Sequence, residues 1–211
     1  YIPAKRKVSI SQQQLKQLEK KLPEKVAIVY SIQFKSLAEK INEYLSKNNS
    51  KEITLFQQVL GCSKPKISKD TEGILLISEG KFHGLGLAIE TGKRVFVYEN
   101  GRFNPVTNEE VKKYKQRKKA IYVKFLNSDK VGILVSTKPG QSRFKRAQKI
   151  KKKLEKQNKE VFIFVCNNIN LGEMDNFPDI QCWINTACPR MDMADERNRL
   201  INLKDVEESL K

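Results

Sequence analysis

Long apolar runs alternate with amphipathic stretches along the chain, and this alternation occurs twice. Residues 25–31 read KVAIVYS, and residues 130–136 read KVGILVS. Each of these runs is followed by apolar positions at helical spacing and then by two further apolar runs. The further runs lie at 52–56, 73–78, 160–166 and 180–185. Continuous apolar strands separated by helices are typical of parallel sheets whose two faces are both covered. The pattern predicts an α/β protein with two similar small parallel-sheet domains.

The repeat places the boundary between the domains in a polar stretch at 127–129. The expected parts are a leading segment with a helix at 1–24, a middle domain at 25–127 and a C-terminal domain at 128–211. The leading helix carries leucines at helical spacing, and Pro23 ends it because proline cannot continue a helix. The middle domain should continue through another strand at 94–98 and then a polar loop at 100–108.

The composition is that of a globular protein. Of 211 residues, 39% are hydrophobic and 31% are charged, which is enough apolar material for one large core or two smaller ones. The longest apolar runs are far shorter than a membrane span, and no secretory signal pattern is present. We therefore expect a cytoplasmic protein without a membrane partner. The first residue is Tyr1 rather than methionine, so we expect a piece of something longer.

The formal net charge is +17, and such an excess usually implies a polyanionic or acidic partner. The basic residues concentrate at 112–119 and 143–159. The second stretch has apolar residues at helical spacing with lysines between them: Phe144, Ala147, Ile150 and Leu154. The more common interpretation of such a stretch is a solvated outer face of a helix.

The chain has four cysteines, namely Cys62, Cys166, Cys182 and Cys188, and none belongs to a CxxC or CxxxCxxC pattern. A metal site would therefore be assembled from distant residues. Cys188 lies in the segment NTACPR, just after an apolar run, in a turn that Pro189 stiffens and beside Arg190. A thiolate is stabilised in such surroundings. The alternative for Cys188 is a buried thiol beside a structural arginine, and we expect Cys166 and Cys182 to be inert.

Three further loops follow predicted strands, at 30–34, 59–63 and 136–143. Loops at the carboxyl ends of parallel strands carry the chemistry of many α/β proteins. The third loop, STKPGQSR, opens a helix, so its backbone N–H groups and cationic side chains could hold a carboxylate or phosphate. Taken alone, each loop can equally well be interpreted as an ordinary strand–turn–helix connection without a functional role. His83 is the only histidine, and a structural, hydrogen-bonded role is the more common one for such a residue.

Taken together in this order, the loops resemble the 2-(3-amino-3-carboxypropyl)histidine synthases, the family that catalyses the first step of diphthamide synthesis. The resemblance covers almost the whole chain, and the TACPR string is its most specific part. The STKPGQ string at 136–141 is similar to the sequences of the archaeal homodimeric branch of this family. The matching segments are YIPA at 1–4, the loop at 30–34, VLGC at 59–62, GKFH at 80–83, STKPGQSR at 136–143 and NTACPR at 185–190.

The resemblance implies three similar α/β domains that each give one cysteine to a [4Fe–4S] cluster. The open iron binds S-adenosylmethionine, whose cleavage yields a 3-amino-3-carboxypropyl radical that adds to a histidine of translation elongation factor 2. The resemblance makes Cys62 and Cys188 the metal ligands in this chain and assigns no catalytic acid or base. The residues expected to bind the substrate, with Gln141 in direct contact, are Ser136, Thr137, Lys138, Gln141, Arg143 and Arg190. For Arg190 the open alternative is that it only braces the loop.

This chain departs from the family pattern at two places. The family's first domain, with its cluster cysteine, should precede Tyr1. We therefore expect the chain to be incomplete alone and to act as a homodimer or beside a separately encoded first domain. After Arg190 the string MDMAD shifts the acidic residues, so no role is assigned to Asp192 or Asp195.

Two other interpretations stay open, a non-catalytic partner or scaffold of such an enzyme and a basic RNA-binding α/β protein. The chain lacks the aromatic-interleaved basic motifs of RNA-binding modules, so nucleic acid is not the expected partner.

Overall fold

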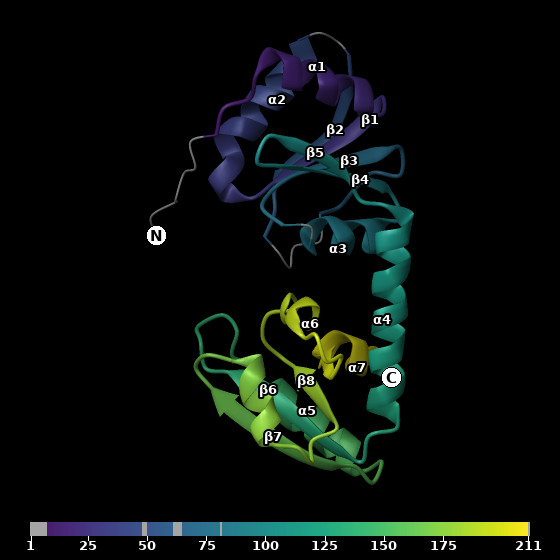
Figure 1. Ribbon diagram of the computed structural model, residues 1–211, viewed down its shortest axis with the longest axis vertical. Coiled ribbons are helices and arrows are strands. Elements are labelled where there is room, and N and C mark those ends of the chain that lie inside the picture. Colours follow the sequence, from purple (N-terminus) through teal and green to yellow (C-terminus); the bar gives the residue numbers. More distant parts are fainter. Residues whose placement is uncertain (1–7, 48–49, 61–64, 81, 211) are drawn as a thin grey trace. The chain divides into compact units, whose positions relative to one another are not determined.

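The computed structural model describes residues 8–47, 50–60, 65–80 and 82–210 (Figure 1). The chain divides into two compact units, Tyr1–Lys112 and Lys113–Lys211. This division falls inside helix α4 (Asn108–Leu126), whereas the sequence placed the domain join near residues 127–129, a boundary that stays a prediction. Among the described residues, no helix combines the length and apolar character needed to cross a membrane.

Unit 1 contains a five-stranded sheet in the order β2-β1-β3-β4-β5. The first four strands are parallel, and β5 runs antiparallel to β4. The strands are β1 (Lys25–Tyr30), β2 (Glu52–Gln58), β3 (Gly73–Ile77), β4 (Arg94–Glu99) and β5 (Arg102–Pro105). The central strands β1 and β3 are buried almost throughout, as their continuous apolar sequences predict.

Helices cover both faces of this sheet (Figure 1). They are α1 (Gln12–Lys21), the short 3₁₀ turn η1 (Ile32–Phe34), α2 (Lys35–Lys47) and α3 (Phe82–Thr91). Leucines of α1 and α2 pack on one face, and Leu87 of α3 packs on the other. Ser11 and Gln14 form a reciprocal capping box that starts α1, and α1 ends before Pro23 as predicted.

The polar loop predicted at 100–108 is wrong in part, because residues 102–105 form strand β5. Asn100 and Gly101 both have positive φ, 49° and 77°. An Asn-Gly pair in this conformation makes the tight turn that folds a strand back on its neighbour. Helix α4 then begins at Asn108, after Thr107 and Glu110 exchange hydrogen bonds in a second capping box.

Unit 2 repeats this arrangement with a parallel sheet in the order β7-β6-β8-β9. Its strands are β6 (Lys130–Ser136), β7 (Glu160–Cys166), β8 (Cys182–Asn185) and β9 (Leu200–Asn202). Its helices besides α4 are α5 (Phe144–Glu155), the 3₁₀ segment η2 (Leu171–Asn176), α6 (Met191–Ala194) and α7 (Leu203–Ser209). This order matches that of β2-β1-β3-β4 in unit 1, so the predicted fold of two similar parallel-sheet domains is confirmed.

Gly132 of the central strand β6 lies beside Trp183 of β8. A Cβ atom at position 132 would come within 2.5 Å of the indole ring, which is itself packed against Phe164 and Phe177. We predict that Gly132→Ala lowers the free energy of unfolding by about 2 kcal/mol, because neither the ring nor the strand can move away. Urea denaturation of the purified chain measures this change.

Gly86 in α3 is the matched control, because a Cβ atom there meets no atom within 4 Å. Gly86→Ala should leave stability unchanged or raise it slightly, since alanine favours a helix more than glycine does. Equal urea midpoints for the two variants would contradict the packing of Gly132 against Trp183.

Candidate functional site

The loop that carries Cys188 is held by a buried asparagine at the end of β8. Asn185 is 2% exposed. Its side-chain amide donates hydrogen bonds to the Cys188 carbonyl at 2.7 Å and to Asn202 Oδ1 at 2.8 Å. Its side-chain oxygen accepts from the backbone N–H of Ala187 at 3.0 Å. One side chain therefore fixes the backbone on both sides of the loop's first turn.

Thr186 attaches the same loop to the neighbouring strand. Its backbone N–H and its hydroxyl both donate to the carbonyl of Leu134 in β6, at 3.2 and 2.8 Å. The Cys188 carbonyl also accepts from the backbone N–H of Met191, which begins α6. The Cys188 thiol is half-buried on this fixed backbone. It can therefore reach a bound group without the loop having to order first.

Asp192 lies beneath this loop and is 5% exposed. Its Oδ2 accepts hydrogen bonds from the Tyr114 hydroxyl at 2.9 Å and from Asn202 Nδ2 at 2.8 Å. Burial raises the pKa of Asp192, while the Tyr114 hydrogen bond and the charges of Lys118 and Arg117 oppose that rise. Burial also raises the pKa of Tyr114, so the phenol stays protonated and donates. The pair joins α4 to the segment that follows Cys188.

Asp195 is the second buried carboxylate of the MDMAD string, at 4% exposure. It accepts hydrogen bonds from three backbone N–H groups, those of Arg197, Arg199 and Leu200. The Arg117 guanidinium donates to the backbone carbonyls of both aspartates. The sequence assigned neither aspartate a role. The structure shows that both brace the turn after Cys188, Asp192 through the distant Tyr114 and Asp195 through backbone N–H groups two to five residues further on.

The loop at 136–143 follows β6 at the same edge of the sheet. Ser136 is buried, and its hydroxyl accepts from the Lys138 N–H at 3.2 Å. The Lys138 carbonyl accepts from the N–H groups of Gln141 and Ser142, and Gly140 takes φ 77° in this tight turn. The side chains from residue 137 to residue 143 are exposed. The turn therefore leaves the side chains of Thr137, Lys138, Gln141 and Arg143 open to solvent.

Helix α5 begins directly after this loop with its first N–H groups uncapped. Arg143 occupies the N-cap position, and its side chain makes no capping hydrogen bond. The first N–H groups of a helix lack partners within the helix, and they favour an anion together with the helix dipole. This arrangement suits a carboxylate, as the sequence predicted.

The two loops lie at one edge of the unit 2 sheet, because β6 and β8 are parallel neighbours that end there. Arg190 is exposed in the turn before α6. The structure thus brings the predicted residues of unit 2 to a common edge: Ser136, Thr137, Lys138, Gln141, Arg143, Cys188 and Arg190. Cys62, the other predicted metal ligand, lies outside the described residues.

The remaining cysteines of unit 2 have different surroundings. Cys182 is fully buried in the core, and burial raises its pKa to about 12. Cys166 ends β7 half-buried, and burial raises its pKa as well. Neither thiol is readily converted to the thiolate that binds iron. In the part of the chain that the structure describes, no three or more His, Cys, Asp or Glu side chains group as a metal site would require.

His83 lies in α3 of unit 1, with its ring edge-on to Phe82 at 5.7 Å between centroids. Its predicted structural role stays a prediction.

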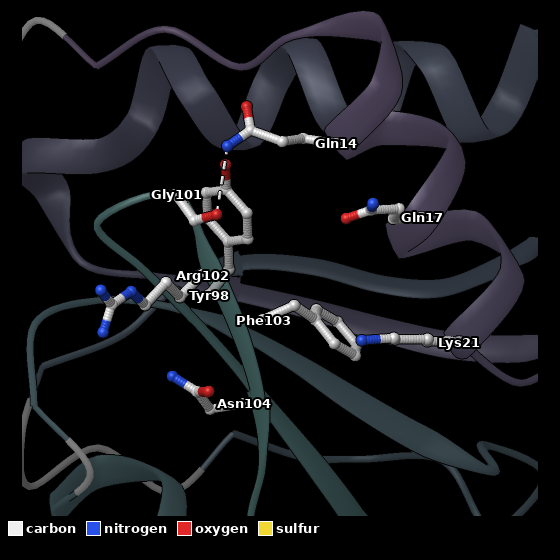
Figure 2. A pocket seen from close by; sticks show the side chains of 8 residues that line it. All are labelled: Gln14, Gln17, Lys21, Tyr98, Gly101, Arg102, Phe103 and Asn104. Atoms are coloured by element: carbon white, nitrogen blue, oxygen red, sulfur yellow. Dashed lines mark hydrogen bonds between the residues drawn. The ribbon is translucent and has the colours of Figure 1, made fainter.

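Unit 1 has a cavity of about 320 Å³ between α1 and the β4–β5 hairpin (Figure 2). The Gln14 amide donates to the Gly101 carbonyl at 3.1 Å, and Lys21 Nζ lies 5.6 Å from the centre of the Phe103 ring. The residues lining it are Gln14, Gln17, Lys21, Tyr98, Gly101, Arg102, Phe103 and Asn104. No thiol or carboxylate is among these described residues, so the cavity is not a candidate for iron ligation.

Comparisons with known proteins agree with the resemblance found in the sequence. The family model described as "Putative diphthamide synthesis protein" matches residues 1–199. The chain is 29% identical to the 2-(3-amino-3-carboxypropyl)histidine synthase of Pyrococcus horikoshii over 98% of this chain and 64% of that protein. It is 33% identical to the synthase of Methanocaldococcus jannaschii over 81% of this chain and 46% of that protein. The chain thus spans under two thirds of the length of these relatives.

Two solved structures are similar to the chain. The crystal structure of Dph2 from Pyrococcus horikoshii matches with a TM-score of 0.85 and 29% identity, over 99% of this chain and 64% of that chain. The structure of the same protein with a 4Fe-4S cluster matches with a TM-score of 0.80, over 94% and 61%.

Proposed function

Because the chain belongs to the diphthamide synthesis protein family, we propose that it forms part of a 2-(3-amino-3-carboxypropyl)histidine synthase. The observation that carries this proposal is the Cys188 loop. A half-exposed thiol stands at the carboxyl end of β8 on a backbone that Asn185 and Thr186 fix. A similar protein has been crystallised with a 4Fe-4S cluster.

Cys188 fits the role of one cluster ligand. Its thiol is accessible and precedes the exposed Arg190, whereas Cys182 is sealed in the core. Cys62 is the second proposed ligand, and a further domain or partner chain supplies the third. When bound, the [4Fe–4S] cluster supplies the electron that cleaves the Cγ–S bond of S-adenosylmethionine reductively.

The residues of the 136–143 loop hold the substrate in this proposal. The amino-acid carboxylate of S-adenosylmethionine accepts hydrogen bonds from the uncapped N–H groups of α5 and from the Gln141 amide. Lys138 and Arg143 add positive charge, and Ser136 and Thr137 shape the turn. Arg190 approaches the same carboxylate from the Cys188 loop. The proposed acceptor of the 3-amino-3-carboxypropyl group is a histidine of translation elongation factor 2.

The oligomeric state belongs to the same proposal. In this proposal the chain supplies Cys62 and Cys188, so the third thiolate comes from other polypeptide. We place that polypeptide in a homodimer or in a separately encoded first-domain partner.

Replacing Gln141 tests the substrate-binding part of the proposal. In the holoenzyme, Gln141→Ala should weaken binding of S-adenosylmethionine about 10-fold, which corresponds to about 1.4 kcal/mol for a lost hydrogen bond to a charged group. Iron and sulfide content should stay unchanged. Titration calorimetry and metal analysis measure the two quantities separately.

Gln148→Ala is the matched control, since Gln148 is an exposed glutamine of α5 beyond its first turn. It should bind substrate as the unsubstituted protein does. Unchanged affinity in Gln141→Ala would remove the 136–143 loop from the proposed site.

A further inference from the structure

The outer face of α5 carries four lysines that the proposed chemistry does not use. They are Lys145, Lys149, Lys152 and the C-cap residue Lys156, whose backbone is still helical, and all four are exposed. Successive residues of an α-helix are about 100° apart, so these spacings place the four within an arc of about 60°. The buried positions Ala147, Ile150 and Leu154 lie on the opposite side of the helix axis. We call these four lysines the lysine face.

The other basic residues of α5 have partners within the protein. Arg146 forms a bidentate ion pair with Glu207 of α7. Lys151 pairs with Glu155 at 3.5 Å, and Lys153 donates to the Leu210 carbonyl at 3.3 Å. By contrast, no side chain of the lysine face has a hydrogen-bond or ion-pair partner within the described structure. Like charges three and four residues apart on a helix repel one another. The four charges are therefore balanced by solvent or by a partner outside the domain.

The chemistry of the lysine face distinguishes between two kinds of acidic partner. Protein–protein interfaces are depleted in lysine and are built around an apolar centre. The lysine face has no apolar side chain at its centre. Interfaces with nucleic acids are strongly positive, and lysines contact phosphates as point charges. The sequence pI of about 9.7 and the net charge of +17 also favour a polyanionic partner such as a nucleic acid.

We propose that the lysine face of α5 binds the phosphate backbone of a nucleic acid without reading its sequence, which revises the expectation drawn from the missing RNA-binding motifs. The four ammonium groups form a row along the helix, parallel to the phosphate row of one strand. This binding surface goes beyond the proposed transferase activity and does not depend on it, because neither the cluster nor its cysteines take part.

The test is the salt dependence of binding to a labelled single-stranded RNA. Each phosphate contact to a single strand contributes about 0.7 to the slope of log K against log salt, so neutralising four lysines should reduce that slope by about 3. The variant is Lys145→Gln/Lys149→Gln/Lys152→Gln/Lys156→Gln in the full chain. Circular dichroism checks that it remains folded.

The control removes the same charge elsewhere. Lys16→Gln/Lys20→Gln/Lys40→Gln/Lys69→Gln changes four exposed lysines of unit 1. We expect this variant to keep the slope of the unsubstituted chain. An equal reduction in both variants would overturn the proposal, because only net charge would then matter, and so would failure of the unsubstituted chain to bind.

Two further probes test whether DNA binds as RNA does and whether an acidic peptide competes for the same lysines. Single-stranded DNA of the same length should bind with the same slope if the backbone alone is recognised. A poly-glutamate peptide of equal charge should bind more weakly than RNA. Equal or tighter binding of the peptide through the same lysines would make the lysine face an acidic-protein site and contradict the proposal. Activity assays are not needed, so failure here leaves the proposed transferase function standing.

Discussion

Replacing Cys188 with alanine should leave the holoenzyme without its [4Fe–4S] cluster. In the proposed enzyme the Cys188 loop supplies one thiolate, and we expect that Cys182 and Cys166, whose pKa values burial raises, do not replace it. A cluster held by cysteines does not survive the loss of a ligand when no other thiolate is in reach. Iron and acid-labile sulfide should therefore fall to background after anaerobic reconstitution, and the cluster's absorption and electron paramagnetic resonance signals should disappear.

The control for this prediction is Cys166→Ala. Cys166 is also half-buried at the carboxyl end of a strand of the same sheet, but it is the last residue of β7 and does not belong to the Cys188 loop. This variant should keep its iron and its spectrum. A full cluster in Cys188→Ala, or loss of the cluster in Cys166→Ala alone, would show that the ligand has been assigned to the wrong loop.

Asn185→Ala should have the second large effect, on stability and on the cluster together. It leaves the Ala187 N–H and Asn202 Oδ1 without the partner that Asn185 supplied, and the Cys188 carbonyl keeps only the Met191 N–H. Each such loss costs about 1–3 kcal/mol, part of which water recovers at the loop surface. We expect a decrease of about 3 kcal/mol in the free energy of unfolding and poor retention of iron.

Two comparisons separate this role from a general effect of losing an asparagine. Asn127→Ala removes an exposed asparagine that caps the end of α4, and it should cost under about 1 kcal/mol. Asn185→Asp should be at least as harmful as alanine, because a buried carboxylate would face two oxygens where the amide donated. A stable Asn185→Asp protein with full iron would contradict the role given to this amide.

The fold was largely predictable because its strands are continuous apolar runs. The strings at 25–31 and 130–136 become β1 and β6, the central strands of two sheets with the same order. The hairpin at Asn100 and Gly101 was missed although the Asn-Gly pair is a strong turn signal. Helix α4 was missed because only Ile121 and Phe125 of its 19 residues are buried, which leaves a weak periodic pattern.

The candidate site was predictable only where it follows strand ends. Loops after β6 and β8 meet at one edge because parallel neighbours end together, so the position of Cys188 and of residues 136–143 could be inferred. The hydrogen bonds that hold the segment after Cys188 could not be inferred from the sequence. Tyr114 and Asp192 lie 78 positions apart, and no local pattern in the sequence links them. The role of Asp192 depends on this long-range partner, whereas Asp195 bonds to the backbone N–H groups of the turn that follows it.

The most direct test of the central claim is mass spectrometry of elongation factor 2 after reaction with the reconstituted holoenzyme. Elongation factor 2, S-adenosylmethionine and a one-electron reductant are incubated without oxygen, and the peptide that carries the target histidine is analysed. We expect a 3-amino-3-carboxypropyl group on that histidine with the unsubstituted chain and none with Cys188→Ala. Unmodified histidine with a fully loaded cluster, or equal modification by both proteins, would contradict it.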